Sequence, residues 1–209
     1  RIIVRMKLLL FDFDGVLVDS LAVYEKTVTD CLNVIGQPLT RGREEFLELF
    51  EDNFYKSLAD KGVNMERFTA ASVDILGGVN YAEMKPFDEI RPVLRQLKKN
   101  HPMVVISSND TPTIREALRL YDFNGIFDDI LGSDFMLSKK DKILYVIKKY
   151  HVTMKDIYYI GDTTGDIKEG RQAGVKTVGV TWGWHGRELM ASARPDHLFD
   201  KPEDLLKLA

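Results

Sequence analysis

The sequence of 209 residues has one cysteine, no long apolar run and no excess of charge of either sign. The lone Cys31 excludes an internal disulfide framework and fits a reducing compartment. No apolar stretch reaches the roughly 20 residues of a membrane-spanning helix, and residues 1–10 are too short and wrongly flanked for a signal peptide. The net charge of −3 offers no basic field for nucleic acid or an anionic membrane. We therefore expect a cytoplasmic protein, monomeric or homodimeric, without nucleic-acid or membrane partners.

Repeats, low-complexity tracts and disordered linkers are also absent, and the four histidines show no metal-ligand spacing. What is present is a set of short, continuous apolar runs, which are typical of strands buried on both faces of a parallel sheet. Helical periodicity alternates with them after Pro86. This alternation predicts an α/β fold with a doubly wound parallel sheet and right-handed crossovers. We expect its strands, the first of them central, at residues 8–11, 103–106, 130–131, 157–160 and 176–180.

Helical periodicity also dominates between the first strand and Pro86. It predicts a helix over residues 21–35, a second from 44 to 61 and a third that ends at Gly77-Gly78. Because this segment separates the first strand from its sheet, we expect an insertion that acts as a lid, with Gly15 and Gly77-Gly78 as hinges. The predicted domains are a helical cap at residues 16–81 and an α/β core formed by residues 1–15 and 82–209.

The end of the first strand carries a pair of acidic residues. Asp12 and Asp14 lie two apart, so in extended geometry both side chains leave the strand on one face, and Gly15 allows a sharp turn after them. In open α/β sheets this edge is where ligands bind. A bound cation would offset the two charges. The alternative is that both residues only cap a turn or a helix. An EF-hand loop that begins at Asp12 is excluded, because such a loop requires glycine at its sixth position, whereas Gly15 is the fourth residue.

A second acidic pair follows the strand at residues 157–160. Asp162 and Asp166 are four residues apart, so both can face the site from the first turn of a helix that begins near Thr163. They would complete a magnesium site built from oxygen ligands. A nucleotide P-loop is not expected, because Arg171-Gln172 replaces the Lys and Ser or Thr of that motif.

Two further polar groups fall at the same sheet edge. Ser107 directly follows the strand at residues 103–106, with Ser108 and Asn109 beside it, and could form a phosphate cradle or simply serve in helix capping. The next helix is expected to open with Thr111 as its capping residue and Pro112 at its first position. Lys139 and Lys140 begin a helix. Lysines usually avoid helix N-termini, so one of them could hold an anion, although both could also be solvated surface residues.

In combination these motifs resemble the haloacid dehalogenase-like hydrolase superfamily. The match spans nearly the whole chain and consists of Asp12-Phe-Asp14-Gly15, Ser107, Lys140 and Gly161-Asp162-Thr-Thr-Gly-Asp166. The helical insertion is similar to the small cap of the subfamily that includes phosphoglycolate phosphatase and β-phosphoglucomutase.

The resemblance implies a magnesium-dependent phosphatase that hydrolyses a small phosphorylated metabolite of the phosphoglycolate or sugar-phosphate type. Asp12 would be the nucleophile and Asp14 the acid and base. Mg²⁺ would be held by Asp12, by the Asp14 carbonyl and by Asp162, with Asp166 binding through water or steadying the others. Ser107 would bind the phosphoryl oxygens and Lys140 would offset charge. Lys140 is preferred to Lys139 on its spacing, although it lacks the proline that follows this lysine in many relatives. Substrate contacts are expected at Gly15, Ser108 and Asn109.

Three other functions remain. A phosphomutase would use the same groups and would depend on a bisphosphate. A dehalogenase would not need Asp14 or magnesium. A binding module that kept the fold without turnover would be inactive on p-nitrophenyl phosphate. Within the lid, the candidates for substrate specificity are Arg41, Arg43, Asn53, Tyr55 and Lys56, each of which could equally lie on a solvated helix face.

Overall fold

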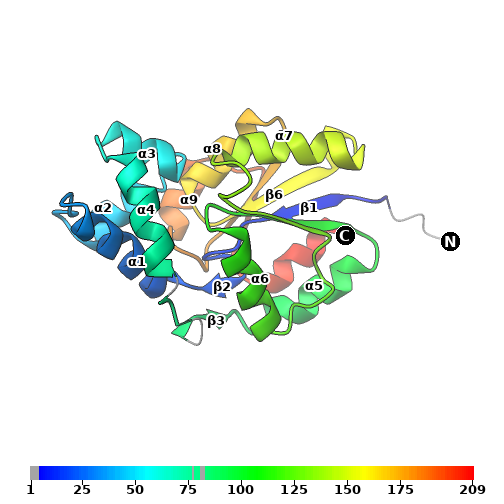
Figure 1. The fold of residues 1–209 in the computed structure, drawn as a ribbon. Coiled ribbons are helices and arrows are strands. Elements are labelled where there is room, and N and C mark those ends of the chain that lie inside the picture. Colours follow the sequence, from blue (N-terminus) through cyan, green and yellow to red (C-terminus); the bar gives the residue numbers. More distant parts are fainter. Residues whose placement is uncertain (1–4, 77, 81–82) are drawn as a thin grey trace.

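The centre of the fold is a six-stranded parallel sheet (Figure 1). The computed structural model describes residues 5–76, 78–80 and 83–209. The strand order is β5-β4-β1-β6-β7-β8, so the first strand lies inside the sheet as predicted. The strands are β1 (Leu8–Phe11), β4 (Met103–Ile106), β5 (Asp129–Leu131), β6 (Ile157–Gly161), β7 (Lys176–Val180) and β8 (His197–Phe199).

Strand β1 is buried on both faces, which is why its sequence is a continuous apolar run. It pairs in parallel with β4 on one side and β6 on the other, with Leu10 opposite Val104 and Tyr159. Leu8 and Leu10 pack in one hydrophobic cluster, whereas Leu9 and Phe11 pack in another. The predicted central strand is therefore confirmed, and its end is fixed from both sides.

Helices cover both faces of the sheet, as a doubly wound fold requires (Figure 1). The cluster of Leu9 and Phe11 includes residues of α5 (Ile90–Lys98) and α6 (Thr111–Leu120), and that of Leu8 and Leu10 includes residues of α7 (Lys139–Tyr150). Strand β8 and the helical segments Arg187–Ser192 and Pro202–Leu208 near the end of the chain are not among the predicted elements. The helices that follow the insertion are α5 (Ile90–Lys98), α6 (Thr111–Leu120), α7 (Lys139–Tyr150), α8 (Thr164–Gln172) and α9 (Arg187–Ser192), with short 3-10 segments η2 (Met154–Asp156) and η3 (Pro202–Leu208).

The predicted helical insertion lies between two short antiparallel strands, β2 (Val18–Asp19) and β3 (Lys85–Pro86). It forms a separate lobe at one end of the sheet (Figure 1) and has a hydrophobic cluster of its own, to which Trp184 of the core also belongs. The helices of the insertion are α1 (Leu21–Val34), α2 (Arg43–Glu48), α3 (Phe54–Asp60) and α4 (Met65–Leu76).

The exact domain boundaries stay a prediction. The predicted cap includes Val16, Leu17 and Val18, yet these residues pack in the hydrophobic cluster of the sheet that also contains Leu9 and Phe11. The boundary expected at residues 81 and 82, and Gly77 of the expected hinge, lie outside the described residues. Among the residues that the structure describes, no helix combines the length and the apolar composition needed to cross a membrane.

Two local predictions are corrected by the structure. The single helix expected over residues 44–61 is two helices, because the chain turns between α2 and α3 and the Phe50 carbonyl accepts a hydrogen bond from Gly165 N at 2.9 Å. Asn53 then caps α3 by accepting from Lys56 N. The residue that caps α6 is Asp110, whose carboxylate accepts from Thr113 N, and not Thr111. In both places a side-chain or long-range hydrogen bond decides the boundary.

Candidate active site

The carboxyl ends of β1, β4 and β6 bring the sequence motifs together. Asp12 follows β1 directly, Ser107 follows β4, and Asp162 follows β6. The backbone N–H of Asp12 still donates to the Ile160 carbonyl at 2.9 Å, so the sheet pairing holds the residue in place. All three side chains are buried.

Three buried carboxylates form a compact cluster at this edge. Asp12, Asp162 and Asp166 each offer one oxygen, and these oxygens lie within 4.8 Å of one another. Burial raises the pKa of Asp162, and the neighbouring Asp166 and Asp12 carboxylates raise it further. Burial likewise raises the pKa of Asp12 to about 7, against the opposing effect of Lys139. The cluster is therefore short of positive charge.

Lys139 is the cation inside this cluster. Its ammonium donates to Asp12 Oδ2 at 2.7 Å and to Asp166 Oδ1 at 2.6 Å, and its side chain is only 7% exposed. Although burial alone would lower the pKa of Lys139, the Asp12 and Asp166 carboxylates raise it well above its ordinary range. Lys139 thus stays charged beside the expected nucleophile.

This geometry favours Lys139 over the predicted Lys140. Lys140 is half-buried, and its side chain has no hydrogen bond or ion pair within the described part of the chain, whereas its backbone N–H donates to Glu169 Oε1 at 3.1 Å. The start of helix α7 determines which of the two lysine side chains faces the sheet edge. Ser138 caps the helix, so Lys139 is its first residue and lies on the same face as Ile143 and Val146, which are fully buried. A side chain on this face points toward the sheet edge.

Asp166 is held rigidly by its own helix. Thr163 caps α8 in a reciprocal capping box, and Asp166 Oδ2 accepts from the Thr163 hydroxyl at 2.8 Å. Asp166 Oδ1 accepts from the Tyr159 hydroxyl at 2.9 Å in addition to Lys139. Burial raises the pKa of Asp166, but Lys139 and the hydrogen bonds from Thr163 and Tyr159 together outweigh burial, so the net pKa is lowered. These contacts favour the ionised form of Asp166.

Asp14 has a different environment from Asp12. It is 6% exposed, and its Oδ2 accepts from Asn109 Nδ2 at 3.3 Å. Burial raises the pKa of Asp14 to about 6, against the effects of the Ser20 hydroxyl and the Asn109 amide. A carboxyl group in this range can both give and take a proton near neutral pH.

Glycines let the backbone approach Asp162 closely. Gly15 has φ of +75°, and a Cβ there would lie 2.0 Å from Asp162 Oδ2. At Gly183 a Cβ would lie 2.4 Å from the same oxygen. Asp162 Oδ2 also accepts from Trp184 N at 2.6 Å. Side chains at either glycine would displace the carboxylate, so the turn after Asp14 serves the acidic cluster directly.

The loop after β4 places the expected phosphate-binding groups. The Ser107 hydroxyl oxygen accepts from Asn109 N at 3.0 Å, which leaves the hydroxyl proton free to be donated. Ser108 and Asn109 are buried beside it.

A second lysine of α7, Lys142, escaped sequence reasoning. Its fully buried ammonium donates to the Ser107 carbonyl at 2.5 Å and to the Gly132 carbonyl at 3.3 Å. Burial, and secondarily Lys139, lowers the pKa of Lys142 to about 7. It ties the ends of β4 and β5 together. Its spacing of three from Lys139 was the available signal, because residues three apart share a helix face.

A divalent cation fits the acidic cluster. Asp162 Oδ1 is buried and has no hydrogen-bond partner among the described residues, and it belongs to a group of three carboxylates beside one lysine. All donors in this group are carboxylate oxygens, which suit Mg²⁺. Asp166 already accepts four hydrogen bonds, from Lys139, Tyr159 and the Thr163 backbone and hydroxyl. Asp12 and Asp162 are therefore better placed as direct ligands than Asp166.

The five candidate specificity residues of the lid are not brought together. Arg41 and Arg43 are exposed and pair with glutamates of the insertion, and Lys56 pairs with Asp60. Asn53 instead bonds to Glu169 and to the Leu137 carbonyl. Tyr55 alone of the five lines the cavity next to the site, and its hydroxyl donates to the Ser108 carbonyl at 2.7 Å.

The fold and this site together define a class of protein. A parallel sheet that delivers an acidic residue from its central strand to a carboxylate cluster, beside an inserted helical lobe, defines an α/β protein with a candidate metal centre. Comparison with known proteins gives the family. The family model described as haloacid dehalogenase-like hydrolase matches residues 9–180, and the chain belongs to this family.

Relatives match over nearly the full length. The chain is 30% identical to a phosphoglycolate phosphatase of Aquifex aeolicus, with 97% of this chain and 96% of the relative covered. It is 22% identical to the pyrophosphatase PpaX of Bacillus velezensis, with 98% and 96% covered. A solved haloacid dehalogenase-like family protein of Streptococcus pneumoniae superimposes with a TM-score of 0.79 at 22% identity, covering 97% of both chains. The expected family and fold are thus confirmed.

Proposed function

We propose that the protein is a magnesium-dependent phosphatase that hydrolyses a small phosphate monoester through an aspartyl-phosphate on Asp12. The family is that of hydrolases, and several full-length relatives are named phosphatases. The observation that carries the proposal for this chain is the buried contact of Asp12 with Lys139 inside the carboxylate cluster. The substrate would be a phosphorylated metabolite of the cytoplasm.

The first half of the reaction follows from the placement of Asp12 and Asp14. A carboxylate oxygen of Asp12 attacks phosphorus, and the bond from phosphorus to the ester oxygen breaks. Asp14, with its pKa raised to about 6, gives its proton to the departing oxygen. Lys139 offsets the charge that gathers on Asp12 and the phosphoryl oxygens, and the Ser107 hydroxyl donates to one of these oxygens.

In the second half, the Asp14 carboxylate takes a proton from water as the water oxygen attacks phosphorus. The bond between phosphorus and Asp12 breaks, phosphate leaves, and both aspartates return to their first state. Mg²⁺, held by Asp12 and Asp162 with the Asp14 carbonyl, would supply positive charge to the phosphoryl group. Asp166 and Tyr159 keep Lys139 and the cluster in position.

The test is the Asp12→Asn variant, assayed with p-nitrophenyl phosphate and Mg²⁺. Loss of the nucleophile should lower kcat by at least about 10³-fold. Asp19→Asn is the matched control, because Asp19 belongs to the same segment but is exposed, and it should keep parental activity. An acid-quenched turnover mixture of the parent should yield a phosphorylated peptide that contains Asp12.

Parental activity in Asp12→Asn would refute the proposal. Activity that requires an added bisphosphate would point instead to a phosphomutase.

A further inference from the structure

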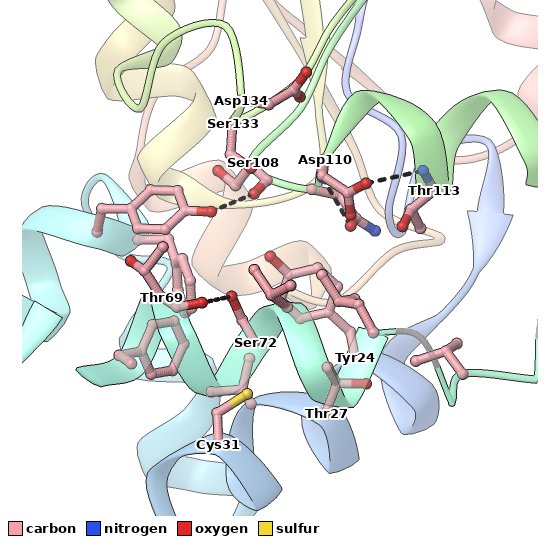
Figure 2. Close-up of a pocket in the computed structure, with 18 of the residues that line it drawn as sticks. Tyr24, Thr27, Cys31, Thr69, Ser72, Ser108, Asp110, Thr113, Ser133 and Asp134 are labelled. Carbon is pink, nitrogen blue, oxygen red and sulfur yellow. Dashed lines mark hydrogen bonds between the residues drawn. The ribbon is translucent and has the colours of Figure 1, made fainter. Parts of the chain in front are cut away.

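A cavity of about 420 Å³ lies between the core loops and the helical insertion, next to the site (Figure 2). Ser108, Asp110 and Asp134 line it from the core, and α1 and α4 form the opposite wall. Asn109, which lines the cavity, also donates to Asp14. The cavity therefore begins one hydrogen bond away from the expected proton donor to the leaving group. Its volume falls in the range of roughly 300–1,000 Å³ that is usual for small-molecule sites.

The wall formed by the insertion is mainly apolar. Its polar groups are few, and the Ser72 hydroxyl already donates to the Thr69 carbonyl at 2.7 Å. Such a surface gains from contact with an apolar group and offers little to a strongly hydrated one. The apolar lining includes Val23, Val28, Phe54, Phe68, Leu76 and Met84.

Charge in the cavity is of one sign. Among the described residues that line it, none is lysine, arginine or histidine, whereas Asp110 and Asp134 are acidic. One Asp110 oxygen caps α6; the other is buried and has no hydrogen-bond partner in the described part of the chain. Arg41 and Arg43 of the insertion are exposed and paired with glutamates, and neither lines the cavity. A substrate carboxylate placed here would meet like charge and no cation.

We propose that the substrate is a monoester whose organic group is mainly apolar, carries no negative charge and presents a hydroxyl or similar donor to Asp110. This inference rests on the proposed phosphatase function and narrows its substrate class. The proposed substrate differs from phosphoglycolate, after which several relatives are named. The organic half of phosphoglycolate is small and ends in a carboxylate. An apolar group would fill the cavity, whereas the glycolate half would leave most of it empty.

Two synthetic esters of similar shape test the charge preference. Benzyl phosphate and 4-carboxybenzyl phosphate differ in one carboxylate that is remote from the ester oxygen. With the parent protein and Mg²⁺, we expect kcat/KM for benzyl phosphate to be at least about tenfold higher than for the carboxylated ester or for phosphoglycolate.

A charge placed in the cavity should reverse this preference. Ser72 lines the cavity from α4 and is half-buried, so Ser72→Lys introduces the missing cation without filling the site (Figure 2). We expect Ser72→Lys to shift the ratio of the two kcat/KM values by about tenfold toward the carboxylated ester. Ser72→Met, of similar length and without charge, should keep the parental ratio.

The outcomes separate the two proposals. Hydrolysis of phosphoglycolate or the carboxylated ester as fast as benzyl phosphate would overturn the inference and leave the phosphatase function standing. The same holds if Ser72→Lys and Ser72→Met give equal ratios. A parent that hydrolyses none of these esters, and not p-nitrophenyl phosphate either, would refute the phosphatase function and the inference with it.

Discussion

At the scale of the residue, the position of Lys139 and Lys140 on helix α7 decides which of the two side chains reaches the carboxylate cluster. Lys139 lies between Asp12 and Asp166, and Lys140 lies one position further round the helix, where its side chain has no hydrogen bond or ion pair within the described chain. Residues one apart on a helix point about 100° away from each other. Only one of the two can reach the sheet edge.

Replacing each lysine by methionine should therefore give opposite results. We expect Lys139→Met to lower kcat/KM for p-nitrophenyl phosphate by about 10²–10³-fold, because the charge on Asp12 and the phosphoryl group loses its buried cation. Lys140→Met should stay within about threefold of the parent. Steady-state kinetics of both variants decide this, and a larger loss in Lys140→Met would contradict the placement.

The site could be predicted in part from the sequence. Asp12, Asp14, Asp162 and Asp166 follow apolar strands, and strand ends are easy to find because buried strands are continuous apolar runs. The prediction of Lys140 rests on the spacing seen in related phosphatases, whereas the structure places Lys139 in the carboxylate cluster. Helical phase could not separate the two lysines in the sequence, because Lys140 is in register with Leu144 and Ile147 just as Lys139 is with Ile143 and Val146. The structure shows that the face of Ile143 and Val146 is the fully buried one.

At the scale of the element, the turn after β1 combines backbone strain with steric demand. Gly15 and Gly36 have nearly the same φ, +75° and +76°, but a Cβ at Gly15 would collide with Asp162 and one at Gly36 would meet open space. The two glycines thus separate the cost of the backbone conformation from the cost of the collision.

Alanine at the two positions should differ sharply. Gly36→Ala should cost about 1–2 kcal/mol of unfolding free energy, the ordinary price of a left-handed residue. Gly15→Ala should cost more and should also abolish stabilisation by Mg²⁺, because Asp162 must move. Thermal unfolding with and without Mg²⁺ measures both effects, and an equal loss in the two variants would show that the collision is relieved without consequence.

The elements differed in how far they could be predicted. The strands β1, β4 and β7 begin and end where expected, because each buried strand coincides with a local run of mainly apolar residues in the sequence. The break between α2 and α3 was missed, because Phe46, Phe50 and Phe54 keep helical spacing across it. The break is made by docking on α8, where a Cβ at Gly165 would lie 2.6 Å from the Phe50 carbonyl oxygen. Such a contact between distant segments leaves no periodic signal.

At the scale of the whole molecule, the buried carboxylates link stability to pH. Burial raises the pKa of Asp12 to about 7 and of Asp14 to about 6, whereas both would titrate near 4 in the unfolded chain. Between about pH 4 and 7 the folded, metal-free protein thus binds more protons than the unfolded chain. The contribution of Asp12 and Asp14 to the free energy of unfolding is therefore complete below about pH 4 and is lost as the pH rises through this window.

Magnesium should restore that stability. Because the proposed Mg²⁺ site would bind ionised carboxylates, saturating Mg²⁺ should raise Tm by about 5 °C or more near pH 8 and by much less near pH 5. Thermal unfolding in EDTA and in Mg²⁺ at both pH values measures this. Asp162→Asn is the control and should reduce the gain near pH 8. A gain that is equal at both pH values would contradict the proposed ligands.

The first turn of α8 has a consequence for how the two lobes communicate. It holds Asp166 by the capping box, and it also docks the insertion through Gly165 N to the Phe50 carbonyl and through the His185 ring, which accepts from Thr164 N and contacts the Leu47 carbonyl. A metal ion bound beside Asp166 and an ester that presses the helical lobe against this turn would both stabilise the same turn. Each would therefore raise the affinity of the protein for the other ligand. Such coupling is reciprocal: the ester should lower the concentration of Mg²⁺ needed for half-saturation by the same factor by which Mg²⁺ lowers that of the ester.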